Sequence, residues 1–109
     1  MAQHIEIYNM PVEEKIKTFE KDRFNVVFTM AVLEHIHSES EWVFREMVKM
    51  TKGYLITIED EHHLSWRHFP RNYKNIFEPL GMKQVEEINC KEIKGLGSHF
   101  RARIFKKIN

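Results

Sequence analysis

The sequence has 109 residues, of which 42% are hydrophobic and 12% aromatic, and its 17 basic residues nearly balance its 16 acidic ones. This length holds one core, so we expect a single domain over residues 1–109, and the apolar content excludes a disordered chain. A net charge of +1 gives no general attraction to nucleic acid or anionic lipid. The single cysteine, Cys90, excludes an internal disulfide, and no secretory leader pattern is visible. We therefore expect a cytoplasmic location and no membrane partner.

The first third of the chain predicts two strands around a short helix. Apolar and polar residues alternate over residues 4–8, which predicts a strand that ends at Asn9. Apolar residues then recur at intervals of four and three over residues 12–19, as in an amphipathic helix. Residues 24–30 are rich in β-branched and aromatic side chains and barely alternate. That pattern is typical of a central parallel strand covered on both faces.

The next segment predicts a helix followed by a second parallel strand. Ser38 and Glu41 have the spacing of a capping box, so the helix is expected to begin near Glu39. Gly53 is expected to adopt the left-handed conformation that closes this helix, and residues 54–58 form the strand. A strand, a helix and a strand in so short a span make a βαβ unit with a right-handed crossover.

The last segment predicts a helix and a terminal β-hairpin. Pro70 suits a first helical turn, and apolar residues at helical spacing over residues 73–80 lead to a stop at Gly81. Residues 85–90 and 100–105 are expected to be strands joined by a turn that contains Gly95-Leu96-Gly97.

Five segments of the chain resemble class I S-adenosylmethionine-dependent methyltransferases, in particular those that modify small molecules and lipids. The most specific is FNVVFTMAVLEHI, which is similar to the end of the family's fourth strand. The others are IEIYNMPVEE (residues 5–14), KGYLI (52–56), HFPRNYKNIFEPLGMKQVEE (68–87) and SHFRARIFKK (98–107). The resemblance implies an α/β, three-layer, partial Rossmann-like sheet running from the family's third strand through its seventh. It would be mostly parallel, with an antiparallel last strand.

The resemblance implies S-adenosylmethionine as cofactor and places several residues near it. Asn9 and Met10 match the positions near adenine. Thr29, Met30 and Ala31, followed by Leu33, match the positions near the cofactor's amino-acid end. The family's first strand, its glycine-rich loop and the acid that binds the ribose have no counterpart among these residues, and Gly95-Leu96-Gly97 is interpreted as a turn. The chain alone is therefore expected to hold an incomplete cofactor site.

The Leu33-Glu34-His35 sequence is the most visible family signature, and two interpretations remain open. Leu33 packs in the core in both. Glu34 and His35 either begin a solvated turn or belong to the site, where His35 is the candidate proton acceptor, since imidazoles titrate near neutrality.

A polar loop follows the second parallel strand, at the sheet edge where α/β proteins bind ligands. Its candidate acceptor-side residues are Glu59, Asp60, Glu61, His62, His63, Trp66 and His68. The alternative is a merely solvated loop. Carboxylates and imidazoles also bind metals, but without a His-x-x-x-His or cysteine pair we predict no metal site. Trp66, Phe69 and Tyr73 either line an acceptor pocket or pack the helix onto the sheet.

Arg101 and Arg103 lie on one side of the last strand by alternation, which we interpret as the charged outer face of an edge strand and not as a nucleic-acid site. Cys90, which has no second cysteine to pair with, is interpreted as a small buried residue and not as a nucleophile.

Two classes of function remain. In the first, the chain transfers a methyl group to a small-molecule or lipid-type acceptor once a second copy or a separate chain completes the cofactor site. In the second, it is a truncated, non-catalytic binding or assembly module. Under either hypothesis, something must cover the open edge that the absent strands leave on residues 24–30.

Overall fold

The computed structural model describes residues 10–97 and 99–108, so the predicted strand at residues 4–8 and Asn9 lie outside the described residues. No helix in this part of the chain is long and apolar enough to cross a membrane. The elements in chain order are α1 (Val12–Lys15), η1 (Ile16–Thr18), β1 (Phe24–Met30), η2 (Leu33–His35), η3 (Ser38–Ser40), α2 (Trp42–Met50), β2 (Thr51–Asp60), α3 (Tyr73–Phe77), η4 (Glu78–Leu80), β3 (Met82–Asn89), η5 (Cys90–Glu92) and β4 (Phe100–Lys107).

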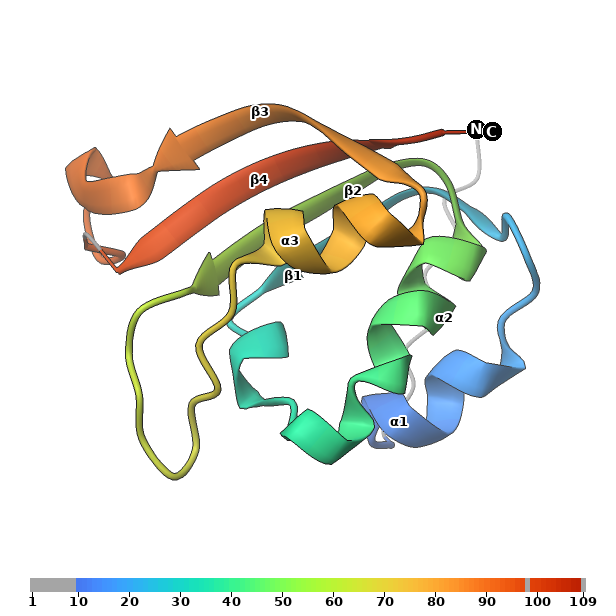
Figure 1. Ribbon diagram of the computed structural model, residues 1–109, viewed down its shortest axis with the longest axis horizontal. Helices are drawn as coiled ribbons and strands as arrows, with labels where there is room; N and C mark the ends of the chain where they lie inside the picture. Colours follow the sequence, from blue (N-terminus) through green and yellow to red (C-terminus); the bar gives the residue numbers. More distant parts are fainter. Residues whose placement is uncertain (1–9, 98, 109) are drawn as a thin grey trace, which may run out of the picture.

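The four strands form one sheet in the order β1-β2-β4-β3 (Figure 1). β1 and β2 pair in parallel, while β4 is antiparallel to both of its neighbours, β2 and β3. Three strands therefore run in one direction and the last strand runs in the other. The expected partial Rossmann-like sheet with an antiparallel last strand is confirmed.

All three helices pack on one face of this sheet (Figure 1). α2, α3 and η1 contribute to a single core with the inward side chains of the strands, and the right-handed crossover from β1 to β2 fixes the side on which α2 lies. The core residues are Ile16, Leu33, Ile36, Val43, Phe44, Met47, Val48, Leu55, Tyr73, Phe77, Met82 and Phe105. The described residues thus supply two of the three expected layers, the sheet and one layer of helices.

The opposite face of β1 is apolar and exposed. Val26, Phe28 and Met30 remain 53%, 70% and 50% exposed. They pair in register with Tyr54, Ile56 and Ile58 of β2, which continue the same face. The prediction that β1 is covered on both faces is wrong within the described residues. The apolar sequence that suggested a buried strand is present, but nothing in the described part of the chain packs on this face.

Gly53 does not close a helix, contrary to the prediction. α2 ends at Met50, and the extended Thr51 begins β2 directly, so Gly53 lies inside a strand. A Cβ atom at this position would lie 2.8 Å from the Asn25 carbonyl oxygen of β1. The glycine therefore permits the close approach of two strand backbones and does not supply a left-handed conformation.

The predicted starts of the two longer helices are also wrong. The His37 imidazole, not Ser38, accepts the capping hydrogen bond from the Glu39 amide, and α2 begins only at Trp42. Glu41 instead binds Arg71, at 2.7 Å from Nε. α3 begins after Asn72, whose side chain accepts a hydrogen bond from the Asn75 amide. Pro70 therefore precedes the helix and does not lie in its first turn.

The end of the α3 helix and the hairpin agree with the sequence. α3 and η4 cover the predicted 73–80 segment, and Gly81 closes them with a left-handed φ of 104°. β3 and β4 pair antiparallel as expected. Gly95 and Gly97 adopt positive φ in the connection between them. Cys90 is buried at the end of β3, as the sequence indicated.

Candidate functional site

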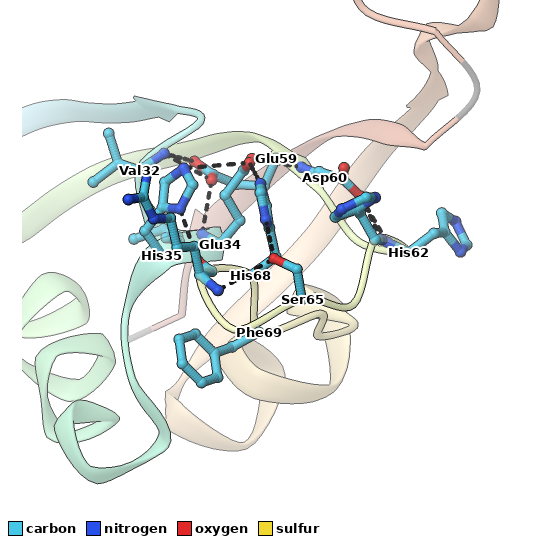
Figure 2. A network of polar contacts seen from close by, with 12 residues as sticks. Val32, Glu34, His35, Glu59, Asp60, His62, Ser65, His68 and Phe69 are labelled. Carbon is cyan, nitrogen blue, oxygen red and sulfur yellow. Dashed lines mark hydrogen bonds and ion pairs between the residues drawn. The ribbon is translucent and has the colours of Figure 1, made fainter.

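The carboxyl ends of β1 and β2 lie side by side and carry a connected network of acidic and histidine side chains (Figure 2). β1 leads into η2, and β2 leads into a loop over residues 61–72. The two segments contact each other, since the Phe69 amide donates a 2.8 Å hydrogen bond to the Glu34 carbonyl. This is the edge at which parallel α/β sheets bind ligands, so the polar residues are where the sequence predicted them.

The Glu59 side chain holds the turn after β1 by hydrogen bonds to its backbone amides. It is fully buried, and its Oε1 accepts hydrogen bonds from the amides of Val32 at 2.9 Å and Glu34 at 3.1 Å. Burial raises the pKa of the Glu59 carboxyl to about 7. Ala31 precedes this turn with a left-handed φ of 55°, and its amide is held by the Ile58 carbonyl at 2.9 Å. The carboxylate thus stabilises a conformation that a non-glycine residue seldom adopts.

Glu34 is the central side chain of the network. It is only 4% exposed, and its Oε1 accepts a 2.9 Å hydrogen bond from the Asp60 amide. Its Oε2 lies 3.4 Å from His68 Nε2 and 3.6 Å from His35 Nε2. The interpretation of Glu34 as part of a solvated turn is therefore wrong. Leu33 lies in the core as expected, and His35 is exposed.

Both imidazoles are oriented by a contact on their other ring nitrogen. His35 Nδ1 lies 2.8 Å from the Arg67 carbonyl oxygen, and His68 Nδ1 lies 2.7 Å from Ser65 Oγ. Ser65 Oγ also accepts a hydrogen bond from the Arg67 amide at 3.2 Å. The loop after β2 therefore fixes the direction in which both rings present Nε2 to Glu34.

A second cluster lies on the other side of the β2 terminus, where Asp60 meets His63 and His99. Partial burial by itself would raise the pKa of the Asp60 carboxyl. The pKa is lowered because Oδ1 accepts hydrogen bonds from the His63 and His62 amides, at 2.8 and 2.9 Å. His99 is a residue that the sequence reasoning missed. The signal was the hairpin register, which pairs Asp60 with Phe100 and so brings residue 99 to this edge.

Arg71 fastens the loop to the rest of the domain. Its guanidinium donates to the carbonyls of Leu33 at 3.1 Å and Ile36 at 2.6 Å, and to the Glu41 carboxylate. It lies 5.0 Å from the centre of the Phe44 ring. One side chain thus joins the turn after β1, the start of α2 and the loop that carries His68.

Arg103 is not part of an exposed basic face, which corrects the interpretation of the last strand. Its side chain is 5% exposed and makes two 2.8 Å contacts with the Glu61 carboxylate, which itself is buried. Gln84 and Glu87 accept its remaining hydrogen bonds. The hydrogen bonds that Arg103 donates to Glu61 raise the pKa of Arg103. Arg101 is more exposed and lies 3.4 Å from Glu87.

The residues matched to the cofactor lie around the open edge of β1. A groove of about 390 Å³ with apolar walls runs along this edge. It is lined by Val12, Ile16, Val27, Phe28, Thr29, Met30, Val32, Leu33, Met47 and Met50. Thr29, Met30 and Leu33 are thus brought together, while Ala31 lies in the turn just beyond. Met10 is exposed at the start of the described chain.

The three aromatic candidates on the loop differ in their surroundings. Tyr73 is fully buried and packs against Phe44 and Phe77, which confirms the packing interpretation for this residue. Burial also raises the pKa of its hydroxyl. Trp66 is 80% exposed, and its ring is covered only by the Arg67 guanidinium at 4.2 Å. Phe69 is half-buried against His37.

Comparison with solved structures gives the class of the fold. A methyltransferase from Archaeoglobus fulgidus that depends on S-adenosylmethionine matches with a TM-score of 0.66 and 15% identity, over 92% of this chain and 66% of that one. The Burkholderia thailandensis 1,6-didemethyltoxoflavin-N1-methyltransferase, solved with its substrate and S-adenosylhomocysteine, matches with a TM-score of 0.70 and 15% identity, over 92% and 49%. No protein-family model and no curated protein matches the sequence.

A third match is the complex between a Haloferax volcanii methyltransferase activator and its methyltransferase, with a TM-score of 0.62 and 11% identity, over 84% and 57%. The chain therefore has the fold of a class I S-adenosylmethionine-dependent methyltransferase. It spans between about half and two thirds of the length of these three proteins.

Proposed function

We propose that this chain is the acceptor-side part of an S-adenosylmethionine-dependent methyltransferase that acts on a small-molecule or lipid-type acceptor. The open edge and uncovered apolar face of β1 carry this proposal. A strand of the family fold would pair with the open edge of β1, and a helix packed on the far side of the sheet would cover its apolar face. In this proposal either a second copy of the chain pairs with β1 and forms a cofactor site without a glycine-rich loop, or a separate polypeptide supplies the strand and the loop.

The chemistry of the reaction asks little of these residues. A sulfonium is already an activated methyl donor, so the protein contributes mainly by aligning donor and acceptor. In this proposal Met10 lies near adenine, and Thr29, Met30, Ala31 and Leu33 lie near the amino-acid end of the cofactor. The acceptor meets the loop that carries Asp60, His62, His63, Trp66 and His68, and Glu59 supports the turn between the two halves.

His35 is the candidate proton acceptor for an acceptor nucleophile. Its Nδ1 contacts a carbonyl oxygen, which can only accept a hydrogen bond, so Nδ1 carries the proton and Nε2 holds the free lone pair. That geometry suits a base.

The test is calorimetric titration of the chain with S-adenosylmethionine and S-adenosylhomocysteine, with the molecular mass measured on the same sample. Micromolar binding by a dimer supports completion by a second copy. Binding only after a polypeptide with the missing strand and loop is added supports a separate chain. A stable dimer that buries β1 and binds no cofactor, with or without such a polypeptide, supports the non-catalytic assembly module instead.

A further inference from the structure

The Glu34 carboxylate and the two imidazoles that face it form a set of three potential metal-ligand atoms. Glu34 Oε2, a His35 nitrogen and a His68 nitrogen all lie within 4.8 Å of one another (Figure 2). Two His residues and one carboxylate are the protein ligands of a common class of zinc site, in which the fourth position stays open.

The distances suit such an ion. Zinc binds nitrogen and oxygen at about 2.1 Å, so ligand atoms at tetrahedral positions lie about 3.4 Å apart. The two separations that involve Glu34 Oε2 are 3.4 Å and 3.6 Å. The two imidazole nitrogens lie within 4.8 Å of each other, so they approach by at most about 1.4 Å when an ion binds.

The hydrogen bonds around the cluster provide a second, independent indication. In the neutral form of His35 the Arg67 carbonyl holds the ring proton on Nδ1, so the Nε2 lone pair points at the buried Glu34 carboxylate. Two acceptors that face each other repel, and a buried carboxylate without a counter-charge is costly. A cation between them removes both penalties.

The outer contacts are those that zinc ligands usually have. Metal-binding imidazoles are held through their other nitrogen by a carbonyl, a carboxylate or a hydroxyl, as His35 is by Arg67 and His68 by Ser65. The second oxygen of Glu34 is held by the Asp60 amide. All three ligands are therefore oriented before any ion binds.

We propose that Glu34, His35 and His68 bind one divalent cation of the zinc type and leave one coordination position open toward the acceptor loop. This binding does not depend on the proposed methyl transfer. It excludes the proton-acceptor role of His35, because a lone pair that binds a cation cannot accept a proton.

The Asp60 cluster provides a matched control. Asp60, His63 and His99 form a similar set within 4.8 Å, but both of those His residues are exposed. The His63 ring lies 4.7 Å from the ring of the proposed ligand His68, whereas the His99 ring contacts His62 and His63, so His99 is the control that leaves the proposed ligands untouched.

The experiment is a titration of tag-free, chelator-treated chain with Zn²⁺ by calorimetry, and with Co²⁺ by visible absorption. We expect one equivalent of Zn²⁺ to bind, with tetrahedral Co²⁺ bands. His35→Gln and His68→Gln should weaken binding at least tenfold, while the control His99→Gln should leave it within about twofold. Circular dichroism checks the fold of each variant, and the exposed position of His35 makes that variant the safest.

Three results overturn the proposal. The first is no saturable Zn²⁺ binding up to millimolar concentration, as expected if a proton occupies the space between His35 and Glu34. The second is binding that survives His35→Gln, and the third is binding that the His99→Gln control weakens as much as the ligand variants do. None of these results depends on cofactor binding, so they do not bear on the proposed methyl transfer.

Discussion

The charge of Glu59 makes the stability of this fold depend on pH. Burial raises its pKa from 4.5 to about 7, so the folded chain holds a proton that the unfolded chain releases. Stability is therefore lost as the pH rises from about 4.5 to about 7. Glu59→Gln keeps an acceptor oxygen for the Val32 and Glu34 amides without this loss.

We expect the free energy of unfolding of Glu59→Gln, relative to the unchanged chain, to increase by about 3 kcal/mol between pH 4 and pH 8. Urea denaturation in the presence of a chelator measures it. An equal difference between the two proteins at both pH values would show that the Glu59 carboxyl does not titrate in this window.

Gly53 tests a steric constraint between β1 and β2. A methyl group there would lie 2.8 Å from the Asn25 carbonyl oxygen, which is backbone and has little freedom to move. Gly53→Ala should lower the free energy of unfolding by about 1–3 kcal/mol, as overpacked sites do. Lys52→Ala, at the exposed neighbouring position, should change it by less than about 0.5 kcal/mol. Comparable losses in the two variants would contradict the proposed clash.

At the scale of single residues, the sequence predicted which residues lie at the site, but not which side chains contact each other there. Glu59, Asp60, His35 and His68 lie at the expected edge because parallel strands bring their carboxyl ends together. The burial of Glu34 was missed, since the side chains that enclose it come from β2 and from a loop more than thirty positions away. A single sequence carries no signal for such contacts.

At the scale of whole elements, the runs of β-branched and aromatic residues predicted the strands correctly. The local capping signals did not predict where the helices begin. The start of α2 was placed at a Ser–Glu spacing, but Glu41 binds Arg71, thirty positions away. A tertiary contact thus overrode a local capping motif. Gly53 was misread for a similar reason, because the close approach of β1 is also a long-range feature.

Arg103 joins three elements, and its removal should be costly. Arg103→Ala leaves the buried Glu61 carboxylate without its partner, so the free energy of unfolding should fall by about 3 kcal/mol. Arg101→Ala removes a longer contact with Glu87 of the neighbouring strand β3, and should cost less than about 1 kcal/mol. Thermal or urea denaturation of the two variants makes the comparison. Equal costs would mean that the Arg103–Glu61 pair contributes no more than an exposed ion pair.

At the scale of the whole molecule, the exposed face of β1 should control assembly. Large apolar patches on soluble proteins mark surfaces that bind other chains or aggregate. We expect the isolated chain to self-associate, and Phe28→Lys to shift it toward monomer in sedimentation experiments. Trp66→Lys is the control, since Trp66 is equally exposed but lies on the loop. Sedimentation of the unchanged chain as a monomer at high concentration would contradict this expectation.

The Arg71 guanidinium limits how far the turn after β1 and the loop after β2 can separate from each other. It holds the carbonyls of Leu33 and Ile36 and the Glu41 carboxylate together, so none of these segments can move away without breaking its bonds. The turn that carries His35 and the loop that carries His68 therefore form one cooperative unit of local unfolding. Their amides should exchange with solvent deuterium at a common rate, and any ligand that orders one segment slows exchange in the other.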